Sequence, residues 1–274
     1  MSKETQEMSF LEHLEVLRWH LVRSVSAIVV FATVAFFNKS FLFDDVIFAP
    51  KNADFITYRF LCETSVFLSG IVPSLLDKDT LCIGQNFPQL QNISMAGQFM
   101  THLLISIVAG LIFAFPYVIW ELWRFIRPAL EDTEKRFTTG IVFFTSTLFT
   151  VGVVFGYFVI VPLSVNFFLT YEISEAVVNL PTLDTYISTL TTIVLASGAI
   201  FELPILVYFL TKIGLITPDF MRLYRKHAIV VSLVLAAVIT PPDVFSQLLV
   251  TGPLLFLYEI SIWVSAFVLK KENK

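Results

Sequence analysis

Long apolar runs alternate with short polar segments along most of this chain. A helix needs about 20 residues to cross about 30 Å of hydrocarbon, and five of the runs are long enough. A sixth run is short, but the polar segments on both sides leave it no other placement, and a bilayer can thin around a short helix. The pattern therefore predicts six transmembrane helices, at roughly 21–38, 98–120, 138–160, 186–211, 228–240 and 245–268.

These runs are apolar at every position, whereas the strands of a membrane barrel are apolar at every second one. The predicted fold class is therefore all-α, a polytopic membrane protein whose six helices form a single domain over residues 1–274. The composition agrees, because 56% of the 274 residues are apolar or aromatic and only 15% are charged, against about 25% charged in soluble domains. The formal charge of -4 provides no basic surface for a nucleic acid.

The distribution of Lys and Arg predicts the orientation of the chain in the membrane. With six crossings, the N-terminus, the segments 121–137 and 212–227, and the tail 269–274 share one side. They hold 14 of the 18 Lys and Arg residues when Arg23, in the first turn of the first predicted helix, is counted with the N-terminus. Both termini are therefore predicted to be cytoplasmic.

The segment 39–97 is a long loop on the opposite, external side. Residues 60–76 within it are apolar but interrupted by polar and helix-breaking residues, which favours a helix lying on the membrane surface over a seventh crossing. Cys62 and Cys82 are the only cysteines of the chain and both lie in this loop. An external, oxidising compartment permits a disulfide, and the alternative is two buried thiols.

Two carboxylates fall inside predicted transmembrane helices. Glu202 lies well inside the fourth helix, where an unpaired carboxylate is costly and so marks a functional candidate; Pro204, two residues on, predicts a kink. The alternative is a protonated Glu202 that bonds to a neighbouring helix. Glu259 lies near the cytoplasmic end of the sixth helix, either as a second intramembrane polar site or paired with Arg222 or Arg225.

Acidic residues lie beside aromatic ones in two segments of the predicted cytoplasmic face. Residues 9–18 have the periodicity of an amphipathic helix, and residues 123–136 combine carboxylates with two aromatic rings. Carboxylates accept paired hydrogen bonds from guanidinium groups. The two segments therefore predict a surface that binds a cationic peptide, with ordinary solvated charge as the alternative.

The sequence gives little support to catalysis. It contains no phosphate-binding loop, no H-E-x-x-H and no C-x-x-C, and its four histidines lack metal-ligand spacing. We expect no enzymatic activity, no cofactor and no metal.

Six segments, in the same order, give the chain a resemblance to TatC, the polytopic subunit of the twin-arginine protein translocase. The resemblance covers nearly the whole chain, and T-P-P-D between the last two predicted helices is a specific motif. The segments are S-F-L-E-H-L-E-V-L-R at 9–18, the stretch 120–130 ending in P-A-L, E-K-R at 134–136, F-E-L-P at 201–204, T-P-P-D-V-F-S-Q at 240–247 and Y-E-I at 258–260.

The resemblance implies a receptor for the paired arginines of signal peptides on folded cargo. It implies helices arranged as a concave bowl in the cytoplasmic (inner) membrane of a prokaryote, and transport driven by the proton-motive force. Carried over by position, Glu134 is the recognition glutamate of the first cytoplasmic loop, Phe125 its aromatic neighbour, and Glu202 the glutamate of the kinked helix. The resemblance also implies a multimeric complex with the single-span partners TatB and TatA near the last two helices, where Gln247 is a candidate contact.

The chain departs from the family pattern in its N-terminal helix. The usual order is His-Leu-x-Glu-Leu-Arg, whereas Val16 stands here at the glutamate position, with Leu17 and Arg18 in their usual places. Glu15 is adjacent but rotated by about 100°, and Glu12 lies four residues earlier on the face of Val16. Both remain candidates to replace the family glutamate.

Two other classes of function remain open from the residues alone. An ion-coupled secondary transporter with Glu202 as its coupling site would be expected to show related halves with paired broken helices, and the sequence shows no such symmetry. A purely structural membrane scaffold is the other alternative.

Overall fold

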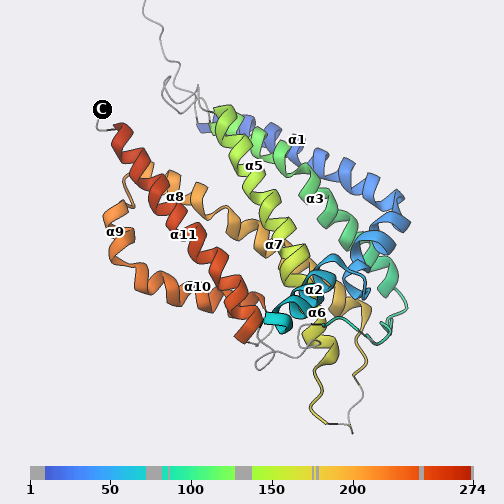
Figure 1. Ribbon diagram of the computed structural model, residues 1–274. Coiled ribbons are helices and arrows are strands. Elements are labelled where there is room, and N and C mark those ends of the chain that lie inside the picture. The colour runs from blue at the N-terminus through green and yellow to red at the C-terminus, as the bar shows by residue number, and fades with distance from the viewer. Residues whose placement is uncertain are drawn as a thin grey trace, which may run out of the picture. The chain divides into compact units, whose positions relative to one another are not determined.

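The computed structural model describes residues 10–71, 82–85, 87–126, 138–174, 176, 179–240 and 244–272. Within these residues the regular structure is helical, apart from one isolated parallel bridge between Gln91 and Thr182. This confirms the predicted all-α class (Figure 1). The chain divides into two compact units, residues 1–39 with 102–147 and residues 40–101 with 148–274. The single domain stays a prediction.

The first unit contains α1 (Phe10–Phe37), most of α3 (Gly97–Ile126) and the start of α5 (Thr138–Phe155). Helix α1 is continuous, so residues 10–18 of the amphipathic segment are the beginning of the first long apolar helix and not a separate element. The backbones of α1 and α3 come very close at Gly110. A Cβ atom at Gly110 would lie 2.7 Å from the carbonyl oxygen of Ile28 and from the backbone nitrogen of Ala32.

The second unit contains the remaining helices of the described residues. Beside the parts of α3 and α5 that fall within it, its elements are η1 (Phe41–Ile47), η2 (Ala49–Lys51), α2 (Ile56–Ile71), η4 (Gly156–Ile160), α6 (Val161–Thr170), α7 (Leu183–Phe201), α8 (Leu203–Lys212), α9 (Pro218–Leu223), α10 (Arg225–Ile239) and α11 (Val244–Glu272).

Helix α5 is followed without a break by further helical turns. The chain continues through the π-helical turn η4 into α6, which ends at Thr170, beyond the predicted end of the third crossing at residue 160; the membrane boundary itself stays a prediction. Pro162 allows this continuation because it lies in the first turn of α6, where a proline is tolerated. Gly156 brings η4 against α7, since a Cβ atom there would lie 2.8 Å from the Oγ of Ser197.

The predicted interruption of the fourth transmembrane helix is confirmed. Thr182 caps the start of α7 by accepting a hydrogen bond from the backbone N–H of Thr185. Helix α7 ends at Phe201 with Glu202 as its C-cap, and α8 begins at Leu203 with Pro204 in its first turn. A proline cannot supply the N–H that a continuous helix would need, so the break follows from the sequence.

Among the described residues, five helical stretches are long and apolar enough to cross a membrane: Leu14–Phe37, Gly97–Ile126, Gly140–Thr170, Leu183–Lys212 and Gln247–Lys270. Helix α10 corresponds to the predicted crossing at 228–240 but has only 15 residues, fewer than the roughly 20 that a full crossing takes. Helix α11 packs against α8, where Thr211 donates a 2.8 Å hydrogen bond to Ser265. The sixth crossing and the orientation of the termini stay predictions.

Candidate functional site

A buried carboxylate joins α1 to α3 in the first unit. Glu121, near the end of α3, is only 1% exposed, and its Oε2 lies 2.5 Å from Nδ1 of His20 on α1. Tyr117, one turn earlier on α3, donates a 3.1 Å hydrogen bond to Oε1 of Glu121. Both oxygens of the buried carboxylate therefore have close polar partners, as a buried charge requires.

Two arginines complete the environment of Glu121. Nη1 of Arg23 lies 3.9 Å from Oε2 and Nη1 of Arg124 lies 3.9 Å from Oε1. Both arginine side chains are about half exposed, so they connect the buried carboxylate to the surface. Both carboxylate oxygens of Glu121 already have these partners. Glu121 is therefore suited to hold α1 and α3 together and not to bind an incoming cation.

Phe125 extends this cluster by one further turn of α3. Its ring lies edge-on to the ring of His20, with the centroids 6.0 Å apart and an angle of 63° between the planes. These contacts bring the early part of α1 and the end of α3 together at His20, Glu121 and Phe125, and the predicted peptide-binding surface of residues 9–18 and 123–136 stays a prediction. Glu15 and Arg18, on the preceding turns of α1, are exposed.

The structure leaves the remaining predicted contacts of this surface untested. Glu134 lies in 127–137, outside the described residues. Glu12 belongs to α1, but its side chain is not among those described, and Val16 is exposed like Glu15. The choice between Glu12 and Glu15 as the replacement for the family glutamate therefore stays open.

Glu202 lies at the junction of α7 and α8 in the second unit. Its Oε1 is buried and has no hydrogen-bond partner among the described residues. A buried oxygen in this state is costly, which fits the interpretation of Glu202 as a functional candidate. It does not identify what Glu202 binds.

The other predicted polar residues have local partners. Arg225, the first residue of α10, donates a 2.8 Å hydrogen bond to Oε2 of Glu259, so of the two alternatives for Glu259 the structure has the pairing with an arginine. Gln247 on α11 donates a 3.2 Å hydrogen bond to the backbone carbonyl of Leu233 on α10. Cys62 and Cys82 form a disulfide, which decides between the two alternatives left open for them.

The contact between His20 and Glu121 is the part of the site that sequence reasoning missed. The two residues stand 101 positions apart, and each looks like an ordinary polar residue at the end of an apolar run. One feature of the sequence could have indicated this contact. Both residues lie next to the predicted cytoplasmic ends of their transmembrane helices, and an acid that is buried there needs a polar partner. Among the described residues no group of three or more His, Cys, Asp or Glu side chains is arranged to hold a metal ion.

Comparisons with known proteins give a consistent result. The family model "Sec-independent protein translocase protein (TatC)" matches residues 12–253. The Sec-independent protein translocase protein TatC of Blattabacterium sp. subsp. Periplaneta americana is 39% identical over 272 residues, which cover 99% of this chain and 100% of that one. The corresponding protein of Aquifex aeolicus is 31% identical over 270 residues, or 97% and 98% of the two chains. A crystal structure of the twin-arginine translocase receptor TatC matches with a TM-score of 0.63 and 31% identity over 94% of this chain and 99% of that one.

Proposed function

This chain belongs to the TatC family of Sec-independent protein translocases, and we propose that it is the signal-peptide receptor and core membrane subunit of a twin-arginine translocase. The observation that carries the proposal is the joining of α1 and α3 through His20 and Glu121, with Phe125 beside them. This cluster gives the first unit a fixed base on which a peptide-binding surface can be built.

We propose that guanidinium groups of the signal peptide bind carboxylates on this surface. A carboxylate and a guanidinium form a paired, planar contact that an ammonium group cannot reproduce. Glu134 supplies one carboxylate, and Glu15 or Glu12 supplies the second. Arg18 follows Glu15 by three residues on the same helix and helps to orient the acid, while Phe125 offers an aromatic ring to the peptide.

The partners of the chain are proposed from its family. Single-span TatB and TatA subunits bind near α10 and α11 in a multimeric complex, with Gln247 at the contact. The complex lies in the cytoplasmic membrane of a prokaryote, with both termini of this chain cytoplasmic, and the proton-motive force drives export of folded cargo. The predicted loop charges support this orientation.

Transport by membrane vesicles tests the proposed function. Vesicles containing this chain with its single-span partners are expected to import a folded reporter that carries a twin-arginine signal. Import should stop when a protonophore is added or when both arginines of the signal become lysine. Import that persists with the lysine signal, or that needs no proton-motive force, would contradict the proposal.

One observation favours a second candidate. The buried Oε1 of Glu202, at a break between two helices, is also what the ion-coupling site of a secondary transporter would require. The two candidates differ in the substrate that moves, so uptake of small ions by vesicles with this chain alone would favour the transporter.

A further inference from the structure

Helix α2 has an unusual distribution of side chains in the second unit. Its buried side carries polar residues, namely Tyr58, Ser65 and Ser69, of which Tyr58 is 2% exposed. Its outer side carries large apolar residues: Ile56, Phe60 and Phe67 are 62%, 67% and 69% exposed. A helix that faces water would place these residues the other way round, so its outer side is suited to a different medium.

The exposed side of α2 is itself divided into two edges. At about 100° per residue, Ile56, Phe60 and Phe67 fall within about 40° of one another. Arg59 and Glu63, both exposed, lie along the neighbouring edge. An apolar edge beside a charged edge on a single helix is typical of helices that lie in the membrane interface.

The buried side of α2 is attached to a helix that crosses the membrane. Thr57 donates a hydrogen bond to the backbone carbonyl of Phe158 in η4, and the ring of Phe55 stacks on that of Phe158 with centroids 5.8 Å apart. Tyr58 lies within hydrogen-bonding distance of the carbonyl of Pro162, at 2.9 Å. These contacts place the first turn of α2 at the depth of Phe158.

The depth of Phe158 follows from the length of its helix. The crossing Gly140–Thr170 has 31 residues, which measure about 46 Å, about 16 Å more than the hydrocarbon core. Phe158 lies 12 residues before Thr170, or about 18 Å along the axis. If the end at Thr170 projects from the hydrocarbon by the full 16 Å or so, Phe158 still lies just inside, because it is about 18 Å from that end. If the other end of the helix projects, Phe158 lies deeper.

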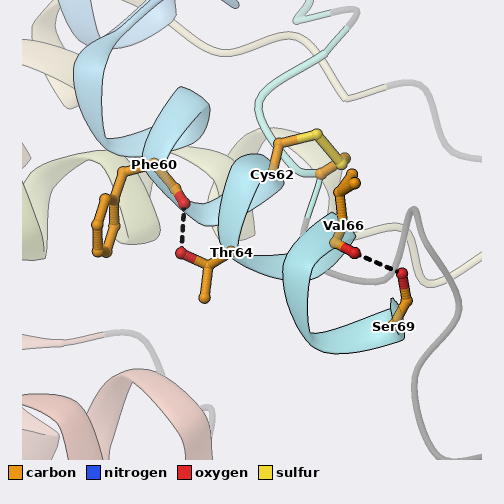
Figure 2. Close-up of a disulfide and its surroundings, with 6 residues drawn as sticks. Phe60, Cys62, Thr64, Val66 and Ser69 are labelled. Atoms are coloured by element: carbon orange, nitrogen blue, oxygen red, sulfur yellow. Dashed lines mark hydrogen bonds between the residues drawn. A yellow bond between two sulfur atoms is a disulfide. The ribbon is translucent and has the colours of Figure 1, made fainter. Parts of the chain in front are cut away.

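The disulfide holds α2 on a different side from its apolar edge. Figure 2 shows the bond between Cys62 and Cys82 on a different side of the helix from the ring of Phe60. Asn166 of α6 fixes the same loop, because its Oδ1 accepts a 3.0 Å hydrogen bond from the backbone N–H of Gly84. The rotation of α2 is thereby fixed with its apolar edge outward.

We propose that α2 is a lipid-binding helix that lies in one leaflet of the membrane, at the depth of Phe158. Acyl chains cover Ile56, Phe60 and Phe67, and lipid headgroups contact Arg59 and Glu63. The commitment to lipid follows from the attachment of α2 to a membrane-crossing helix at the depth of the hydrocarbon edge. The proposal is independent of the peptide-receptor function.

Fluorescence quenching of the full chain in lipid nanodiscs tests this proposal. A small fluorescent noncanonical amino acid replaces Phe60, Phe67 or Glu63 in separate variants, and Ile173, an exposed apolar residue of the segment after α6, is the control. The quenchers are a phospholipid spin-labelled on its acyl chain and iodide in the water. All four positions are exposed, and unchanged helical circular dichroism verifies the fold of each variant.

Positions 60 and 67 are expected to be quenched by the acyl-chain label and to be at least about threefold less accessible to iodide than positions 63 and 173. Equal access of iodide to positions 60 and 63 would overturn the proposal, since it would place the apolar edge in water. Protection of positions 60 and 67 from both quenchers would also overturn it, because protein would then cover the edge.

Discussion

His20 on α1 and Glu121 on α3 are joined by a 2.5 Å contact between Nδ1 of the imidazole and Oε2 of the carboxylate. The contact closes the first unit near the end where α1 begins and α3 ends. The Phe125 ring lies edge-on to the ring of His20 in the same cluster. In the proposed receptor, a peptide-binding surface built from α1 and α3 would depend on this largely buried pair.

Replacement of Glu121 by alanine is expected to destabilise the protein by about 1–3 kcal/mol, because His20 and Tyr117 lose their buried acceptor. Glu121→Gln keeps an acceptor oxygen and should lose less. Thermal unfolding of the detergent-purified protein measures the difference. Glu15→Gln, at an exposed position, is the matched control, and a Glu121→Ala variant as stable as this control would contradict the structural role.

The close approach of α1 and α3 makes Gly110 intolerant of a side chain. Gly110→Ala places a Cβ atom 2.7 Å from backbone atoms of α1, which should cost about 1–3 kcal/mol through separation of the helices. Gly140→Ala is the matched control, since a Cβ atom there has nothing within 4 Å and alanine favours the helix. Equal melting temperatures for the two variants would exclude the tight crossing.

The disulfide between Cys62 and Cys82 should contribute about 3 kcal/mol to stability, because it closes a loop of about 20 residues. A reductant is expected to lower the melting temperature of the wild type. It should leave a Cys62→Ser, Cys82→Ser double variant, which already melts at the lower temperature, unchanged. A wild type insensitive to reductant, with both thiols shown to be free, would refute the bond.

Glu202→Gln is expected to preserve or raise stability and to leave signal-peptide binding unchanged. A neutral amide is less costly to bury than a carboxylate, and Oε1 of Glu202 has no hydrogen-bond partner in the described part of the chain. Thermal unfolding and peptide titration measure both effects. A large loss of stability would show that the carboxylate makes a bond that the fold requires.

The sequence predicts the helices well because their signal is local. Five of the predicted crossings fall on long apolar helices of the described residues, and the kink predicted from Pro204 coincides with the junction of α7 and α8. The helix of the third predicted crossing continues to Thr170 because a proline in the first turn of α6 does not interrupt it. The apolar pattern alone does not show where that helix ends.

The candidate site is less predictable because its contacts are distant in sequence. Phe125 and the acids of 9–18 are visible as local patterns, but the pairing of His20 with Glu121 depends on how two helices pack. The pairing of Cys62 with Cys82 likewise depends on distances that the sequence does not give. The resemblance to a family provided the roles that local chemistry leaves open.

Binding of a twin-arginine signal peptide to the purified protein tests the central claim most directly. The same peptide with both arginines changed to lysine is the comparison, and Glu134→Lys is measured beside Glu172→Lys, an exposed acid of the segment after α6. We predict that affinity falls at least about tenfold, or about 1.4 kcal/mol, for the lysine peptide and for Glu134→Lys, but not for Glu172→Lys. Equal affinity for both peptides in the wild type would contradict a receptor that recognises guanidinium groups.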